Sequence, residues 1–74
     1  MNIKYTRHAK RRMKWRKITE KEIRDVIAKP DEIKKFFNNH KIKVLKKISR
    51  RKIHVIYAVE NNQIVVITAI DKEK

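Results

Sequence analysis

The stretch ITEKEI, residues 18–23, carries the strongest local structural signal in the chain. Thr19 and Glu22 have the spacing of a capping box, in which each side chain accepts a hydrogen bond from the other residue's backbone N–H. Ile18 and Ile23 flank the box at the spacing of a hydrophobic staple. The stretch therefore predicts the start of a helix. The apolar face of this helix is expected to comprise Ile23, Val26 and Ile27, and Pro30 is expected to end it.

A first helix is predicted directly upstream, over residues 7–16, because Thr6 is a good N-cap residue. Ala9 and Met13 are four residues apart and lie on one face of this helix. Residues 2–5 alternate enough to form a short strand before it. An adjoining face of the helix is expected to carry His8, Arg11, Arg12 and Trp15.

After Pro30 the hydrophobic period changes from helical to strand-like. Strands are predicted over residues 33–37, 41–49, 53–59 and 64–70, with turns at NNHK, SRRK and ENNQ. The last strand is apolar on both faces, which indicates an interior strand. We therefore expect one α+β domain, residues 1–74, with two short helices followed by an antiparallel meander. The expected core comprises Ile23, Val26, Ile27, Val55, Tyr57 and Val66.

The charge of the chain is extreme and unevenly placed. The formal net charge is +14, from 22 Lys and Arg against 8 Asp and Glu. Residues 1–17 contain eight basic residues and residues 41–52 contain seven, and neither segment contains an acid. Charge runs are usually solvated surface, but two acid-free blocks favour one functional basic face. Such a field attracts polyanions, so nucleic acid is the first expected partner and an anionic membrane surface the second.

Several function classes are disfavoured by what the sequence lacks. There is no cysteine, so disulfides and thiolate metal sites are excluded, and the three histidines have no convincing metal-ligand spacing. The absence of glycine excludes Gly-rich phosphate loops. No apolar run approaches the roughly 20 residues that span a bilayer. We expect a cytoplasmic protein with no metal, no cofactor and no membrane insertion.

Three motifs, HAKRRM at residues 8–13, ITEKEI and IVVITAI at residues 64–70, together resemble a widespread group of small proteins. That group is known mainly as a domain of unknown function with a His-Ala-x-x-Arg-Met motif, and it is placed near the RelE/ParE and BrnT toxins. The resemblance extends from Tyr5 to Ile70. Lys17 departs from it, because the group often has glycine before the second helix.

The resemblance implies a RelE-like fold, in which two N-terminal helices pack on a curved antiparallel sheet of three to five strands. It also implies a toxin of a type II toxin–antitoxin system, acting as a metal-independent endoribonuclease on mRNA, either free or on the ribosome. An acidic antitoxin would then be a partner besides RNA. The sequence leaves open whether the protein is an enzyme. The alternatives are a non-catalytic basic nucleic-acid-binding module and a ParE-like toxin that inhibits a protein target.

Metal-independent RNA cleavage needs proton transfer and cations that stabilise charge on the phosphate. His8 is the candidate acid or base, since imidazole titrates nearest neutrality, and it matches the histidine of the group's motif. Arg12 lies one helical turn further on and can clamp a phosphate. His54 and Tyr57 lie on opposite faces of one strand, so either one, but not both, can complete the site. Thr68 is the only polar residue of the last apolar strand, and in barnase-like folds a Ser or Thr there often lines the site.

Each of these candidates also has an ordinary structural interpretation. A histidine at a helix start can hydrogen-bond to backbone, Arg12 can be exposed or paired with an acid of the second helix, and a strand threonine can simply pack. A lysine at position 46 shares the row of apolar residues on its strand, so it must snorkel or face a cleft. The residues expected to contact RNA phosphates are Arg11, Lys46, Lys47, Arg50 and Arg51.

Overall fold

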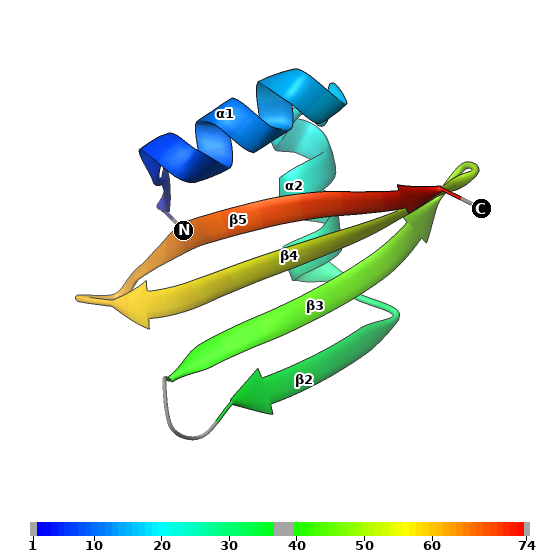
Figure 1. Ribbon diagram of the computed structural model, residues 1–74. Coiled ribbons are helices and arrows are strands. Elements are labelled where there is room, and N and C mark those ends of the chain that lie inside the picture. The colour runs from blue at the N-terminus through cyan, green and yellow to red at the C-terminus, as the bar shows by residue number, and fades with distance from the viewer. Residues whose placement is uncertain (1, 37–39, 74) are drawn as a thin grey trace.

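Five strands and two helices make up the part of the chain that the computed structural model describes, residues 2–36 and 40–73 (Figure 1). In chain order they are β1 (Ile3–Tyr5), α1 (Arg7–Arg16), α2 (Glu20–Ala28), β2 (Glu32–Phe36), β3 (Lys41–Ile48), β4 (Arg51–Glu60) and β5 (Gln63–Glu73). The strands form one sheet in the order β1-β5-β4-β3-β2. α2 packs against one face of the sheet, whereas α1 lies along β5 (Figure 1).

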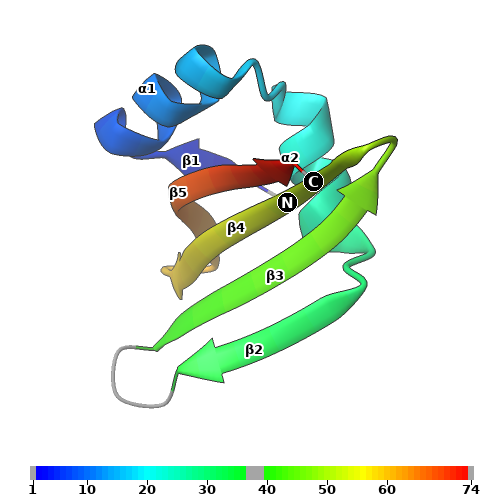
Figure 2. The same cartoon turned by 45° about the vertical axis from the view of Figure 1, so that its right-hand side comes forward.

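The sheet is mixed, and the predicted RelE-like antiparallel sheet is therefore wrong. β2 to β5 form the expected antiparallel meander, but β1 pairs in parallel with β5, with Ile3 opposite Ile64 and Tyr5 opposite Val66. Figure 2 shows β1 beside β5, under α1. The alternation of residues 2–5 correctly indicated a strand, but alternation carries no information about the partner of a strand or its direction.

The parallel pairing follows from the open edge of β5, whose backbone groups need partners. The N–H of Ile64 donates to the carbonyl of Asn2 at 3.1 Å, and the N–H of Thr6 donates to the carbonyl of Val66 at 3.0 Å. After Tyr5, which lies opposite Val66, the chain leaves the sheet and forms α1. This helix lies beside the remaining part of β5. One edge of the meander is thus closed first by a strand and then by a helix.

The local signals at the helix starts are confirmed. The capping box is complete, since the hydroxyl of Thr19 accepts from the N–H of Glu22 at 3.1 Å and Oε1 of Glu22 accepts from the N–H of Thr19 at 2.9 Å. Thr6 caps α1 by accepting from the N–H of Ala9 at 3.0 Å. Lys17 ends α1 in the left-handed conformation, with φ at 57°. Glycine is the favoured residue at such a position.

The strand boundaries differ from prediction by one to three residues. The SRRK turn is tighter than expected, because Arg51 and Lys52 already pair with β3. The ENNQ hairpin is confirmed, and both Asn61 and Asn62 have positive φ, as a two-residue hairpin turn of this kind requires. β2 is described from Glu32 to Phe36, and residues 37–39, which include the predicted end of this strand and the first half of the NNHK turn, lie outside the described part of the chain.

The hydrophobic core lies between α2, α1 and one face of the sheet. Four of the six predicted core residues are fully buried, namely Ile23, Val26, Val55 and Val66. The other two, Ile27 and Tyr57, are only partly buried and pack at its margin. The core reaches beyond the prediction mainly through Ala9, Met13, Ile18, Val44, Ile53, Ile64 and Ala69.

Arg51 joins the end of α1, the start of α2 and the end of β5. Its guanidinium donates to Oδ2 of Asp71 at 3.1 and 3.2 Å and to the carbonyl of Arg16 at 2.9 Å. It also donates to the carbonyl of Lys17 at 3.3 Å and lies 3.6 Å from a carboxylate oxygen of Glu22. The Asp71 side chain is only 7% exposed, so this pair is largely removed from water. Arg51 therefore stabilises the junction of both helices with the sheet.

Replacing Arg51 should destabilise the fold. Arg51→Ala leaves the buried Asp71 carboxylate without its main partner, and we expect a loss of about 3 kcal/mol in unfolding free energy. Arg50→Ala is the matched control, since Arg50 is exposed and forms no ion pair among the described residues, and it should change stability by less than about 0.5 kcal/mol. Urea denaturation measures both. Equal effects of the two substitutions would contradict the structural role of Arg51.

Candidate nucleic-acid interface

The face of the sheet opposite α2 is not covered by a helix (Figure 1), and we call it the open face. Its membership follows from the register, because residues directly opposite each other on paired strands share a face, and Val44 and Val55 mark the covered side. Between its basic residues lies a mostly apolar floor. The residues that the register places on the open face include Glu32, Lys34, Lys41, Lys43, Leu45, Lys47, Lys52, His54, Ile56, Ala58, Val65, Thr68 and Ile70.

Two pairs of lysines lie directly opposite each other on the open face. Lys34 pairs with Lys43 across β2 and β3, and Lys47 pairs with Lys52 across β3 and β4. Like charges in directly opposed positions destabilise a sheet. The first pair lines a cavity of about 240 Å³, together with Glu32, Ile33, Leu45 and His54. The face thus contains charge repulsion that a bound anion would relieve.

α1 adds a second basic element at the β5 side of the sheet. His8, Arg11, Arg12 and Trp15 have the spacing i, i+3, i+4 and i+7, which places them in one stripe along the helix. All four side chains line one open pocket of about 310 Å³. In most surface helices such a stripe is the apolar one that faces the core. Here the core stripe is Ala9 and Met13, and this stripe stays at the surface.

His8 and Thr68 lie next to each other although 60 residues separate them in sequence. Nε2 of His8 lies 3.1 Å from the hydroxyl of Thr68, and which group donates depends on the imidazole tautomer. Thr6 sets this contact, because its hydroxyl donates to the carbonyl of Ile67 at 3.0 Å while it caps α1. The pairing of β4 with β5 has an irregularity at this point, between Ile56 and Tyr57.

His54 and Tyr57 lie on opposite faces of the sheet. His54 lies on the open face, opposite Leu45 and Ile70, and is a diagonal neighbour of Thr68, which pairs with Ile56. Such diagonal neighbours are about 7–8 Å apart. Tyr57 lies on the covered face, against the core. The structure therefore brings His8, Thr68 and His54 to one side of the sheet.

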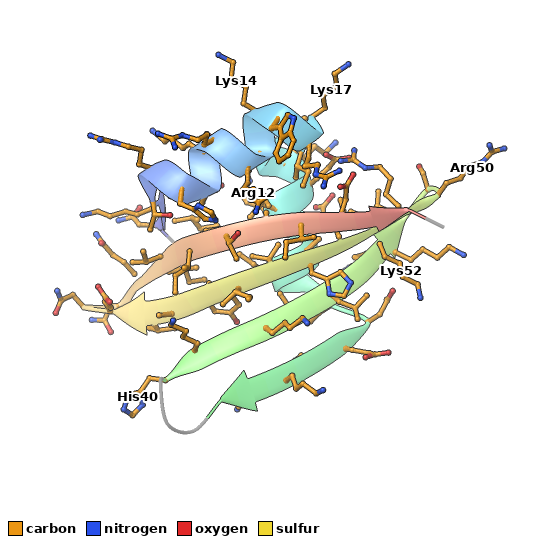
Figure 3. All side chains as sticks on the ribbon, in the orientation of Figure 1. Arg12, Lys14, Lys17, His40, Arg50 and Lys52 are labelled. Carbon is orange, nitrogen blue, oxygen red and sulfur yellow. The ribbon has the colours of Figure 1, made fainter. Side chains whose placement is uncertain are left out.

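The remaining predicted contacts are divided between the two faces. Lys47 lies on the open face, Arg11 lies in the stripe of α1, and Arg50 extends from the β3–β4 turn (Figure 3). Lys46 lies on the covered side and its Nζ donates to the carbonyl of Lys29 at 2.9 Å, just after the end of α2. A cation is favourable there, since the last carbonyls of a helix carry partial negative charge. Arg51 is likewise occupied by internal partners.

A larger groove of about 740 Å³ opens on the other side, between α2 and the β4–β5 hairpin. It is lined mainly by apolar side chains, among them Ile27, Tyr57 and Val59, and by Arg24. Burial raises the pKa of Tyr57 above its usual value. Burial, and secondly the charge of Glu20, raises the pKa of Tyr5. Neither tyrosine is suited to act as a base near neutral pH.

Two further properties concern residues 2–36 and 40–73 alone. Within them no three His, Cys, Asp or Glu side chains are grouped in a way that could hold a metal ion. Neither helix in this part of the chain is long and apolar enough to cross a membrane.

The family model described as "Domain of unknown function (DUF4258)" matches residues 5–71. The chain belongs to the DUF4258 family. This confirms the resemblance to a family of unknown function, whereas the relation to RelE, ParE and BrnT toxins stays a prediction. Comparisons of this DUF4258 chain with curated proteins and with solved structures gave no significant match.

Two features of the interface were not recognised as functional from the sequence. The sequence shows that Trp15 shares a helical stripe with His8 and the arginines. It does not show that this stripe is exposed, because that depends on which face of α1 packs against the sheet. The lysine pairs Lys34–Lys43 and Lys47–Lys52 could not be read, because they depend on the strand register, which no sequence pattern specified.

Proposed function

We propose that this DUF4258 protein binds single-stranded RNA across α1 and the open face. The observation that carries the proposal is that two pairs of lysines are register partners on adjacent strands, Lys34 with Lys43 and Lys47 with Lys52. Opposed lysines cost stability in the free protein. A polyanion bound over the open face would turn this cost into binding free energy.

The basic side chains are also largely unneutralised. Among the described residues, the ion pairs of lysine and arginine involve only Arg16 and Arg51. Their partners Asp71 and Glu22 are committed to the helix–sheet junction, and Asp31 accepts a hydrogen bond from the backbone N–H of Lys47. Binding of phosphates to the other described lysines and arginines therefore need not break ion pairs, and it is supported by the release of counterions from the nucleic acid.

A single strand fits this surface better than a duplex. Apolar side chains on the open face, Leu45, Ile56 and Ile70, lie between the lysines, and an exposed tryptophan lies in α1. Unpaired bases can contact apolar and aromatic side chains while the backbone follows the cations. In an A-form duplex the base faces are stacked and hidden.

The proposal predicts that a 10-nucleotide oligo(U) binds with a steep salt dependence. For about five phosphate contacts the log–log slope is roughly −3.5, measured by fluorescence anisotropy. Lys43→Glu should reduce the magnitude of the slope by about 0.7 or more, and it should also raise the melting temperature because it removes the repulsion with Lys34.

Lys21→Glu is the matched control, because it makes the same change in net charge on the exposed side of α2. It should leave the slope and the affinity nearly unchanged. A slope near zero, or equal effects of the two reversals, would contradict binding at the open face. Tighter binding of duplex than of single strand would contradict the choice of RNA form.

A second candidate function, RNA cleavage, is favoured by the contact between His8 and Thr68. A hydroxyl that orients an imidazole beside arginines is an arrangement suited to acid–base chemistry on a phosphodiester. The imidazole would take the proton of the 2′-hydroxyl, whose oxygen attacks phosphorus. The bond to the 5′-oxygen breaks, and that oxygen receives a proton from imidazolium. Arg12 would stabilise the charge on the phosphate.

The products of this reaction are a 2′,3′-cyclic phosphate and a free 5′-hydroxyl. His54 lies on the same face, one diagonal position from Thr68, and would be the candidate for a second imidazole. Growth arrest by such cleavage, on or off the ribosome, and neutralisation by an acidic partner protein would make the protein a toxin. This is the function that the resemblance implied.

The cleavage proposal predicts that His8→Ala abolishes the cyclic-phosphate product while oligonucleotide affinity stays within about threefold, because one imidazole adds little to phosphate binding. Thr68→Val, which keeps the shape of the side chain, should lower the rate by about 10²-fold at unchanged affinity. Cleavage of labelled RNA, with and without ribosomes, is the assay. Cleavage by His8→Ala at the full rate, or none by the wild type, would leave RNA binding as the whole function.

A further inference from the structure

Trp15 is the most exposed large hydrophobic side chain of those identified at the surface, with 68% of its area accessible. It lies in the last full turn of α1, whose buried residues are Ala9 and Met13. The indole thus contributes little to the core. A single exposed apolar side chain is ordinary in itself, so its meaning depends on what surrounds it.

Two arginines surround the ring. The guanidinium carbons of Arg12 and Arg16 lie 5.5 and 5.0 Å from the ring centroid. Arg16 is also held by Asp71, whose carboxylate lies 3.7 Å from Nε. In Figure 3, Arg12 lies between α1 and the sheet, whereas Lys14 and Lys17 extend away from it. These cation–π contacts restrain the indole and place two phosphate-binding groups over the ring, where a stacking base would take the place of a guanidinium.

We propose that Trp15 is the stacking site for one unpaired base of RNA, with Arg12 and Arg16 bound to the adjoining phosphates. The inference rests on the RNA-binding function proposed above and adds to it a specific element that recognises bases. Aromatic rings and guanidinium planes are the groups on which proteins stack bases of single-stranded RNA. Phosphate contacts alone would not require an aromatic ring at this position.

The position of Trp15 also determines the path of the bound RNA strand across the protein. Trp15 and His8 are seven residues apart, which is about 10 Å along a helix, and the pocket of about 310 Å³ extends between them. Arg11 and Arg12 line the pocket in the middle. A strand whose base stacks on Trp15 therefore has its phosphates at the arginines and a neighbouring sugar near His8 and Thr68. Stacking would fix which sugar reaches the imidazole.

Other occupants of this surface fit it less well. A second copy of the chain carries the same net charge of +14, which opposes contact between two basic helices. An anionic membrane would attract the charge and accept an indole, but it offers no planar group to stack on the ring. A nucleobase linked to phosphates matches both the ring and the arginines.

The chain contains one tryptophan, so its intrinsic fluorescence reports on Trp15 alone. We expect oligo(U) to quench this fluorescence on binding, whereas an oligonucleotide of the same length with abasic sites should bind with little quenching. Trp15→Ala should weaken binding of oligo(U) about tenfold, and should leave binding of the abasic oligonucleotide within about twofold. Trp15→Tyr should recover most of the affinity. Anisotropy of labelled oligonucleotides measures affinity separately from the quenching.

The outcomes separate this inference from the function on which it rests. Tight, salt-dependent binding without quenching, and equal affinity of Trp15→Ala and wild type for oligo(U), would overturn the stacking site and leave RNA binding standing. Equal losses for oligo(U) and the abasic strand would also overturn it, because Trp15 would then act on the fold rather than on the base. Quenching only by anionic vesicles would show a membrane contact instead. Absence of binding to any oligonucleotide would refute both proposals.

Discussion

The hydrogen bonds of Thr6 are the constraint on which the functional surface depends. One residue donates from its backbone to Val66, donates from its hydroxyl to Ile67, and accepts the first capping bond of α1. Without these hydrogen bonds, α1 could begin at another position along β5. Because strand β1 ends and α1 begins at this residue, the stripe from His8 to Trp15 is fixed beside the sheet. The contact of His8 with Thr68 is a direct consequence.

The charges of the molecule are divided into two groups with different uses. At the junction of the helices and β5, Arg51 and Asp71 are paired and largely buried, and Lys46 satisfies the end of α2. On the open face, lysines lie opposite one another, and no described lysine or arginine there or in the stripe of α1 forms an ion pair within the described part of the chain. Stability alone would favour mixed charges there, since opposite charges on facing strands attract. The second group therefore reduces stability in the free protein and increases attraction for a polyanion.

The sequence predicted the local elements well because their signals are local. Thr19 and Glu22 specify the start of α2, Thr6 specifies the start of α1, and the Asn61–Asn62 pair specifies the last hairpin. What failed was the long-range pairing: a short alternating segment such as residues 3–5 does not reveal that it joins β5 in parallel. The candidate site divides in the same way. His8 and Arg12 were proposed from residue type and helical spacing, and Thr68 from its polarity within an apolar strand and from the resemblance. The internal roles of Lys46 and Arg51, in contrast, depend on which strand residues face α1 and α2.

The central claim is that RNA binds across α1 and the open face, and mapping by NMR tests it most directly. Backbone amide and lysine side-chain signals would be followed while oligo(U) is added to the wild-type protein. The account predicts shifts along residues 8–16 and at Lys43, Lys47 and Lys52, with α2 and the groove beside Tyr57 unchanged. Shifts concentrated at α2 and that groove, or no shifts at saturating oligonucleotide, would contradict it.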